Sequence, residues 1–409
     1  MSWSADKARL EAGNHGRILS VLARRPPLSV AAVLVVTAIT TVWDLWGWLD
    51  NVLHRPFTNV DFVAYYSAAL VGRDQGWSRI YDFRLQAQAA ASFGAPFLDF
   101  INPPPLAWLV APFSLLPFRA AYAVWVALLL AALLVAWWLA APRDPFKRAA
   151  TLTAALGLFA VAFALQLGQA AVIDAVALVF AWRLLRSGRE IPAGLLLGVA
   201  IALKPQPLWL VPVALLAAGH RRAFGAALLA VVLLIGASIA ILGRDGTSAA
   251  LTAVAYYENA PLHRHFALAG TLGRTLFTTA LQVAFAGLAV VAARRRRASL
   301  EDVLAAGAVG SLLLSPHVTY QDFTVLVLAA WLVLRRRAPW PLQLLFVLGW
   351  LAVELALVVG PLPVLVAEVL WLGWLLLAAS FENHEHGRAE QDDPERREDA
   401  ADHRQHHLE

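Results

Sequence analysis

Long uninterrupted apolar runs constrain this chain more than any other feature of its sequence. The run AVWVALLLAALLVAWWLA at 123–140 is one of several. A helix rises about 1.5 Å per residue, so roughly 20 such residues cross the ~30 Å hydrocarbon core of a bilayer. Of the 409 residues, 60% are hydrophobic and 15% are charged, whereas soluble domains lie nearer ~45–50% and ~25%. The sequence predicts an all-α polytopic membrane protein and excludes a soluble globular fold.

The arginines lie in short clusters between the apolar runs, which is typical of cytoplasmic loops under the positive-inside rule. The net charge of +5 therefore indicates contact with anionic lipid headgroups, and no nucleic-acid partner is expected. With these clusters placed inside, the chain is predicted to cross the membrane about twelve times with both termini cytoplasmic. The predicted spans are 28–49, 118–140, 149–166, 169–186, 190–203, 206–219, 223–243, 272–293, 299–315, 320–334, 339–358 and 361–380.

This topology divides the chain into a cytoplasmic lead-in at 1–27, a transmembrane domain at 28–381 and a disordered cytoplasmic tail at 382–409. Two long segments, 50–117 and 244–271, are expected on the outer face as loops. Within the first of them, the stretch PPPLAWLVAPFSLLP at 103–117 is short and interrupted by prolines. It is expected to be re-entrant, and the alternative is a further crossing.

Polar side chains without an orienting role collect on the predicted outer face. Lys204 is the most informative of them, because a cation on that face opposes the positive-inside rule. The residues that we consider candidate substrate contacts are Tyr65, Tyr66, Asn102, Gln169, Tyr320, Gln321 and Asp322.

Asp61 lies in the segment TNVDFVAYYSAALV at 58–71. A cap at Thr58 or Asn59, followed by one apolar stripe, predicts an amphipathic juxtamembrane helix lying on the membrane surface. The carboxylate has two interpretations. It either complements the helix dipole or acts as a general base at the lipid–water boundary.

The basic residues of this face also have two interpretations each. Lys204 either anchors a helix end by snorkelling or supplies a point charge to a phosphate. The triplet His263, Arg264 and His265 is either a solvated loop or an anion clamp. His317 is either a structural residue of a turn or a further phosphate contact.

Several kinds of chemistry are not supported by the sequence. The chain has no cysteine, which excludes disulfides, thiolate nucleophiles and cysteine-based metal sites. No span carries paired histidines at metal-binding spacing, and no phosphate-binding glycine loop or serine-hydrolase elbow is present. We therefore expect no metal and no cofactor.

Six segments, taken in order, resemble glycosyltransferase family 87. They are DFVAYYSAA at 61–69, IYDF at 80–83, NPPPLAWLVAPFSLLPF at 102–118, LGQAAVIDAVALVFAWRLLRSGR at 167–189, AGLLLGVAIALKPQPLWLVP at 193–212 and SPHVTYQDFTVLVL at 315–328.

The resemblance implies a GT-C-like helical bundle and a catalytic aspartate early in the first outer loop, which falls on Asp61. It also implies inverting transfer of a sugar, such as mannose or another hexose or pentose, from a polyprenyl-phosphate donor. The acceptor would be a lipid or glycan. The expected location is the inner (plasma) membrane, with the site facing the periplasm or exterior. A transporter or flippase of polyprenyl lipids or solutes is the alternative; the absence of two matching halves speaks against it.

Overall fold

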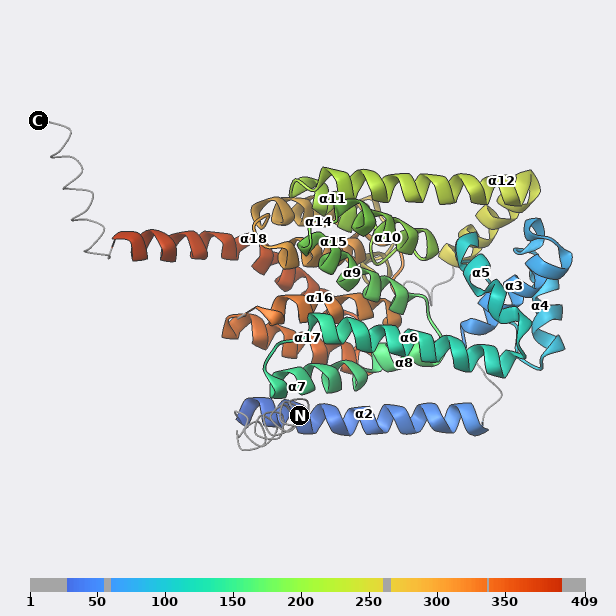
Figure 1. Ribbon diagram of the computed structural model, residues 1–409, viewed down its shortest axis with the longest axis horizontal. Coiled ribbons are helices and arrows are strands. Elements are labelled where there is room, and N and C mark those ends of the chain that lie inside the picture. The colour runs from blue at the N-terminus through green and yellow to red at the C-terminus, as the bar shows by residue number, and fades with distance from the viewer. Residues whose placement is uncertain (1–27, 55–59, 260–265, 337, 392–409) are drawn as a thin grey trace, which may run out of the picture. The chain divides into compact units, whose positions relative to one another are not determined.

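The computed structural model of the chain describes residues 28–54, 60–259, 266–336 and 338–391. Side chains are described for 30–50, 60–257, 266–336 and 338–377. Every regular element within these ranges is a helix (Figure 1). The predicted all-α class is confirmed for the described part of the chain.

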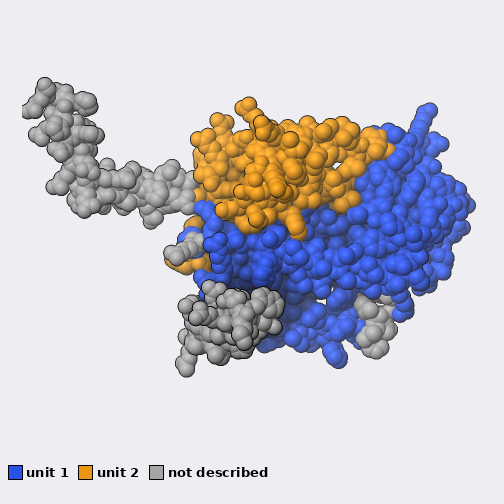
Figure 2. Space-filling model, in the orientation of Figure 1, with its two compact units in different colours: residues 1–179, 238–254, 320–339 blue, residues 180–237, 255–319, 340–409 orange. Residues whose placement is uncertain are grey.

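The described helices form two compact units, coloured separately in Figure 2, and each is described by itself. Unit 1 comprises 1–179, 238–254 and 320–339; unit 2 comprises 180–237, 255–319 and 340–409. The helices of unit 1 are α2 (Leu28–His54), α3 (Phe62–Gln75), η1 (Trp77–Arg79), α4 (Phe83–Ser92), α5 (Pro104–Val110), η2 (Ala111–Leu115), α6 (Phe118–Ala140), α7 (Pro145–Leu156), α8 (Phe159–Leu167), η4 (Tyr320–Phe323) and α16 (Thr324–Arg335). Those of unit 2 are α10 (Glu190–Leu203), α11 (Val211–Ala217), α13 (Leu268–Leu272), α14 (Leu276–Arg295), α15 (Leu300–Leu314), α17 (Trp340–Val359) and α18 (Leu362–Gln391). Helices α9 (Ala171–Arg186) and α12 (Arg221–Asn259) contribute to both.

Five of the described helices are long and apolar enough to cross a membrane, and a bent pair would make a sixth. The five are Val30–Asp50, Phe118–Ala140, Arg221–Tyr257, Leu276–Arg295 and Trp340–Val359. The chain is thus a multi-pass membrane protein, while the predicted count of about twelve crossings stays a prediction. Many of the other predicted spans are helices shorter than 18 residues, so length alone does not identify them as crossings.

Several predicted boundaries differ from the observed ones. The span predicted at 149–166 is broken into α7 and α8, which meet at an angle of 58°. The outer loop predicted at 244–271 is largely helical, because α12 continues through a kink at Gly243 as far as Asn259. The boundary predicted at 381 lies inside α18, and residues 392–409 lie outside the described ranges.

The segment at 50–117 was predicted to be an outer loop with juxtamembrane and re-entrant helices. From residue 60 onward it folds into the short helices α3, η1, α4, α5 and η2. Residues on all sides of α3 are buried, from Phe62 to Gly72, where the helix packs against α4, α5 and η2. The amphipathic stripe predicted for this helix is therefore wrong: other short helices of unit 1 cover the side that was expected to face water. Helix α4 does have a single buried side, formed by Gln86 and Ala90 one turn apart.

Pairing of small residues joins elements within each unit. In unit 1, Thr37 on α2 shares a 2.7 Å hydrogen bond with Thr153 on α7. In unit 2, α15 is the central helix and is buried from Glu301 to Leu313. A Cβ at Gly307 would lie 2.7 Å from the Cα of Val211, so α11 approaches α15 as closely as two backbones allow.

Candidate functional site

Asp61 immediately precedes α3, in unit 1, and its side chain does not cap the helix. Its backbone already has helical angles, φ −60° and ψ −25°, which turn the side chain away from the amide groups of the first turn. Instead, the half-buried carboxylate accepts a hydrogen bond from Nε2 of Gln169. The carboxylate is thus held by a distant side chain, and the helix start does not depend on it for a cap.

Gln169 is itself fixed in one orientation. Its Oε1 accepts hydrogen bonds from the hydroxyl of Tyr65, at 2.7 Å, and from the backbone N–H of Ala170, at 2.9 Å. These two donors show that the atom beside them is the amide oxygen, because an amide nitrogen is itself a donor and could not accept from them. Nε2 must then point toward Asp61. Tyr65 and Gln169 are both buried, so the chain of hydrogen bonds from Tyr65 to Asp61 lies largely inside the protein.

Aromatic residues of α6 hold the turn that carries Gln169. The Tyr122 hydroxyl donates to the carbonyl of Gln166 at 2.6 Å, and Nε1 of Trp125 donates to the carbonyl of Gly168 at 2.8 Å. Gly168 has φ +66°, a left-handed conformation that favours glycine, and a Cβ there would lie 3.0 Å from that of Phe62. Residues of α3, α6 and the turn after α8, which lie at least 43 positions apart in sequence, thus converge beside Asp61.

Two of the predicted substrate contacts have structural partners in unit 1. The Tyr66 hydroxyl donates to the carbonyl of Leu116 at 2.7 Å, and burial raises the pKa of this phenol. The backbone carbonyl of Asn102 accepts a 2.6 Å hydrogen bond from the hydroxyl of Tyr81. Burial also raises the pKa of Tyr81, which keeps it a neutral donor at physiological pH. These bonds join the short helices between α2 and α6.

The three predicted contacts of the 320–322 turn form the 3₁₀ helix η4, which packs against α8 in unit 1. Tyr320, Gln321 and Asp322 are all buried, and the Tyr320 ring meets that of Phe159 edge to face at 5.3 Å. Asp322 is 1% exposed, which is exceptional for a carboxylate.

In unit 2, Lys204 follows α10 and has an extended backbone conformation. Its side chain is 7% exposed, which does not match a lysine that snorkels to keep its ammonium group in water. The segment after it is held on α15, where the hydroxyl of Ser311 accepts from the backbone N–H of Leu210 at 3.0 Å. The ammonium group is therefore carried by a backbone fixed at both ends.

His317 is connected to the same segment within unit 2. The side-chain amide of Gln206 forms a hydrogen bond with Nε2 of His317, with 2.8 Å between the two nitrogen atoms. The ring of Tyr257 meets the histidine edge to face at 5.4 Å. The backbone of the turn is also held, because the carbonyl of His317 accepts from the hydroxyl of Ser315 at 2.5 Å. His317 thus belongs to an ordered cluster within unit 2.

Sequence reasoning missed Gln206 and Tyr81 as partners of the candidate residues. The sequence does contain a feature that could have drawn attention to Gln206: it lies between Pro205 and Pro207, two residues after the anomalous Lys204. No feature of the sequence indicates the role of Tyr81, because its partner is a backbone carbonyl 21 residues away.

The predicted residues do not all enter one described cluster. Asp61, Tyr65 and Gln169 are joined by hydrogen bonds in unit 1, while Lys204 and His317 belong to unit 2. The triplet His263, Arg264 and His265 lies outside the described residues. Among the residues that are described, no three histidine, aspartate or glutamate side chains gather in a way that could hold a metal ion.

The helices and candidate spans define a polytopic membrane protein, and the hydrogen-bonded network around Asp61 gives it a candidate polar site. The family model "Glycosyltransferase family 87" matches residues 100–316, which is more than half of the chain. The chain belongs to glycosyltransferase family 87 and is a membrane glycosyltransferase. Neither a curated protein nor a solved structure matches it.

The match assigns the family that the six segments had indicated. It does not assign roles to individual residues. Asn102, Gln169, Lys204 and the His263–His265 triplet lie within the matched residues. Asp61 precedes them and His317 follows them, so the roles of both rest on the geometry described above.

Proposed function

We propose that this glycosyltransferase transfers a sugar from a polyprenyl-phosphate donor to a lipid or glycan acceptor, with inversion at the anomeric carbon, on the extracytoplasmic face. Asp61 is the general base. The observation that carries the proposal is the carboxylate of Asp61, half-buried and held by Gln169, whose orientation is in turn set by Tyr65 and Ala170.

The chemistry follows from this arrangement. The acceptor hydroxyl oxygen attacks the anomeric carbon from the side opposite the phosphate, and its proton passes to the carboxylate of Asp61. The bond between the anomeric carbon and the phosphate oxygen breaks, and its electron pair leaves with the polyprenyl phosphate. One bond forms and one breaks in a single displacement, which inverts the configuration of the sugar.

We assign Gln169 to positioning Asp61 and not to direct substrate contact. Both acceptor directions of its Oε1 are used within the protein, by Tyr65 and Ala170. One N–H of Nε2 is directed at Asp61, which restricts the carboxylate to one orientation. A base held in this way loses little orientational freedom when the acceptor binds.

Departure of the lipid phosphate leaves negative charge that fixed cations stabilise. Lys204 is the candidate for this role, because a buried ammonium group on a fixed backbone needs little reorganisation. His317 is a second candidate, as is the triplet His263, Arg264 and His265. We retain Gln321 and Asp322 as candidate sugar contacts.

A donor panel tests the proposed function. Purified protein is incubated with radiolabelled polyprenyl-phosphate sugars and a native lipid extract, and labelled products are separated by chromatography. Transfer from at least one polyprenyl-phosphate sugar is expected. Transfer from a nucleotide sugar alone, or counterflow of a solute across vesicles without any transfer, would contradict the proposal.

Cysteine labelling tests the proposed face, since the chain contains no native cysteine. Ser92→Cys, exposed at the end of α4, and the half-buried Thr319→Cys should react with an impermeant maleimide added to intact cells. Ser187→Cys and Ala298→Cys, both exposed, should react only after permeabilisation. Labelling of Ser92→Cys and Thr319→Cys from opposite sides would overturn a shared outer face and indicate that 103–117 crosses.

A further inference from the structure

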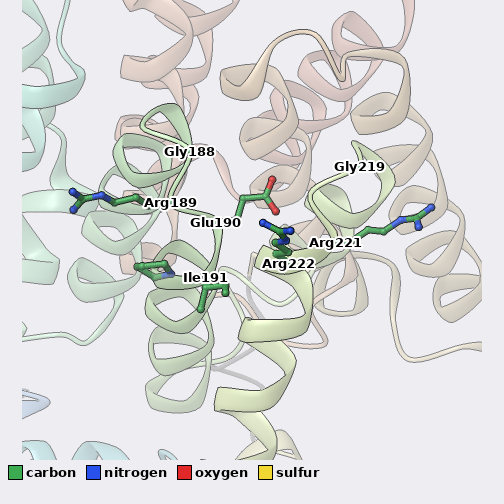
Figure 3. A pocket seen from close by; sticks show the side chains of 8 residues that line it. Gly188, Arg189, Glu190, Ile191, Gly219, Arg221 and Arg222 are labelled. Carbon is green, nitrogen blue, oxygen red and sulfur yellow. The ribbon is translucent and has the colours of Figure 1, made fainter.

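Unit 2 contains a cavity at the opposite end of α10 from Lys204. Its volume is about 480 Å³, within the roughly 300–1,000 Å³ typical of small-ligand sites. It lies where the turn at Gly188 leads into α10 and the turn at Gly219 leads into α12 (Figure 3). Since α10 has 14 residues, the cavity and Lys204 are separated by about 20 Å along the helix. This site is therefore distinct from the proposed site of transfer.

The charged side chains of the cavity are three arginines and one glutamate. Glu190 is already paired, with Oε1 2.9 Å from Nδ1 of His220. In the part of the chain that the structure describes, the guanidinium groups of Arg189, Arg221 and Arg222 have no protein acceptor or ion-pair partner. Figure 3 shows the side chain of Arg222 beside Glu190, while those of Arg189 and Arg221 point outward to either side of the space between the two turns. All three arginines are exposed. The lining of the cavity thus carries three arginines against one glutamate, and no group among the described residues neutralises this excess of positive charge.

Two helices add to this positive charge. Both α10 and α12 begin at the cavity, and the N-terminal end of a helix carries unpaired N–H groups and a partial positive charge. Arg189 precedes α10 and its side chain does not cap the helix. The arginines and the helix ends together favour a ligand with an anionic oxygen group, above all a phosphate.

An apolar ridge begins at the cavity and runs along α10. Ile191 lines the cavity and is 54% exposed, and Leu195 and Val199 follow at intervals of four residues with 41% and 42% exposed. Side chains four residues apart lie on one face of a helix. A cationic cavity that continues into an apolar ridge matches an amphiphile with an anionic head and a hydrocarbon tail.

We propose that this cavity binds the phosphate headgroup of an anionic membrane lipid, whose acyl chain lies along Ile191, Leu195 and Val199. Arg222 contacts the phosphate within the cavity, and the outward-pointing Arg189 and Arg221 add to the positive potential at its rim. Free inorganic phosphate shares the headgroup chemistry but lacks the chain that the ridge would hold. The inference does not depend on the proposed transfer reaction.

Equilibrium binding of radiolabelled phosphatidylglycerol to the full-length, detergent-solubilised protein tests the proposal. The double variant Arg221→Gln/Arg222→Gln should bind at least about tenfold more weakly. Arg294→Gln/Arg297→Gln is the matched control: both arginines are exposed, belong to the same unit and lie outside the cavity, so affinity should change less than about twofold. Phosphatidylcholine with the same chains should compete at least about tenfold less well than phosphatidylglycerol.

Three results would overturn the proposal. Equal losses in the two double variants would indicate attraction to net charge alone. Displacement of the lipid by millimolar inorganic phosphate would indicate a free-phosphate site that does not use the ridge. Full affinity in Arg221→Gln/Arg222→Gln would place the lipid elsewhere. Arg221→Lys/Arg222→Lys, which keeps the charge and loses bidentate contact, should bind with intermediate affinity and separates a binding defect from misfolding.

Discussion

Replacing Asp61 by asparagine is expected to lower the rate of sugar transfer by at least about a hundredfold, because a carboxamide cannot accept the acceptor's proton. Folding should be retained. The side chain does not cap α3, and the Oδ1 of an asparagine can still accept the hydrogen bond from Gln169. Donor binding should be retained or become tighter, since a negative charge near an anionic donor is removed. Turnover, donor affinity and thermal unfolding in detergent check the three expectations separately.

Asp74→Asn is the matched control for this variant. Asp74 lies at the other end of α3 and is exposed, and its hydrogen bond with Arg73 lowers the pKa of its carboxyl group. Its replacement removes the same charge from the same helix, and turnover should stay near that of the wild type. An Asp61→Asn variant that keeps more than about a tenth of the activity would reject Asp61 as the base. Asp99, which lies between α4 and α5, would then be the next candidate.

Replacing Lys204 by alanine is expected to weaken the binding of a polyprenyl phosphate by about ten- to a hundredfold. A charge-assisted contact to a phosphate contributes about 1.5–3 kcal/mol, and about 1.4 kcal/mol corresponds to a factor of ten. The side chain is buried on a fixed segment, so the lost charge is not readily replaced by a neighbouring flexible side chain. Direct titration of the purified protein with the lipid phosphate measures the effect.

Lys147→Ala controls for the loss of a lysine, because Lys147 is exposed on α7 and should not change the affinity. A purely structural role at the end of α10 predicts a different pattern for Lys204→Ala. Thermal stability would fall while the affinity of the folded protein for the lipid phosphate stayed unchanged. Lys204→Arg, which keeps the charge, should recover part of the affinity and would not do so if packing alone mattered.

The family and the class of the protein could be predicted from the sequence because both depend on patterns that are local. Apolar runs long enough to cross a bilayer are visible in any window of about 20 residues. The ordered segments between Asp61 and the 315–328 stretch were sufficient to indicate the family that the 100–316 match assigns. The sequence also singled out Lys204, because its charge conflicts with the orientation rule.

The surroundings of each candidate residue were less predictable. Helix α3 was expected to lie on a membrane surface, and it is buried because α4, α5 and η2 cover it. Periodicity reports which residues are apolar and not which later segment packs against them. In the same way, the outer loop expected at 244–271 is mostly helical, since a second helical stretch follows the non-helical residue Gly243 and reaches Asn259.

The sequence by itself therefore determined that the chain is a polytopic helical membrane protein, which family it belongs to, and which polar residues are out of place in such a chain. Only the tertiary structure decided that Gln169 holds Asp61, that Gln206 holds His317, and that Arg189, Arg221 and Arg222 line one cavity. The physical reason is the range of the interactions. Apolar runs and helix length are patterns of neighbouring residues, whereas the first two of these arrangements join side chains more than 100 positions apart.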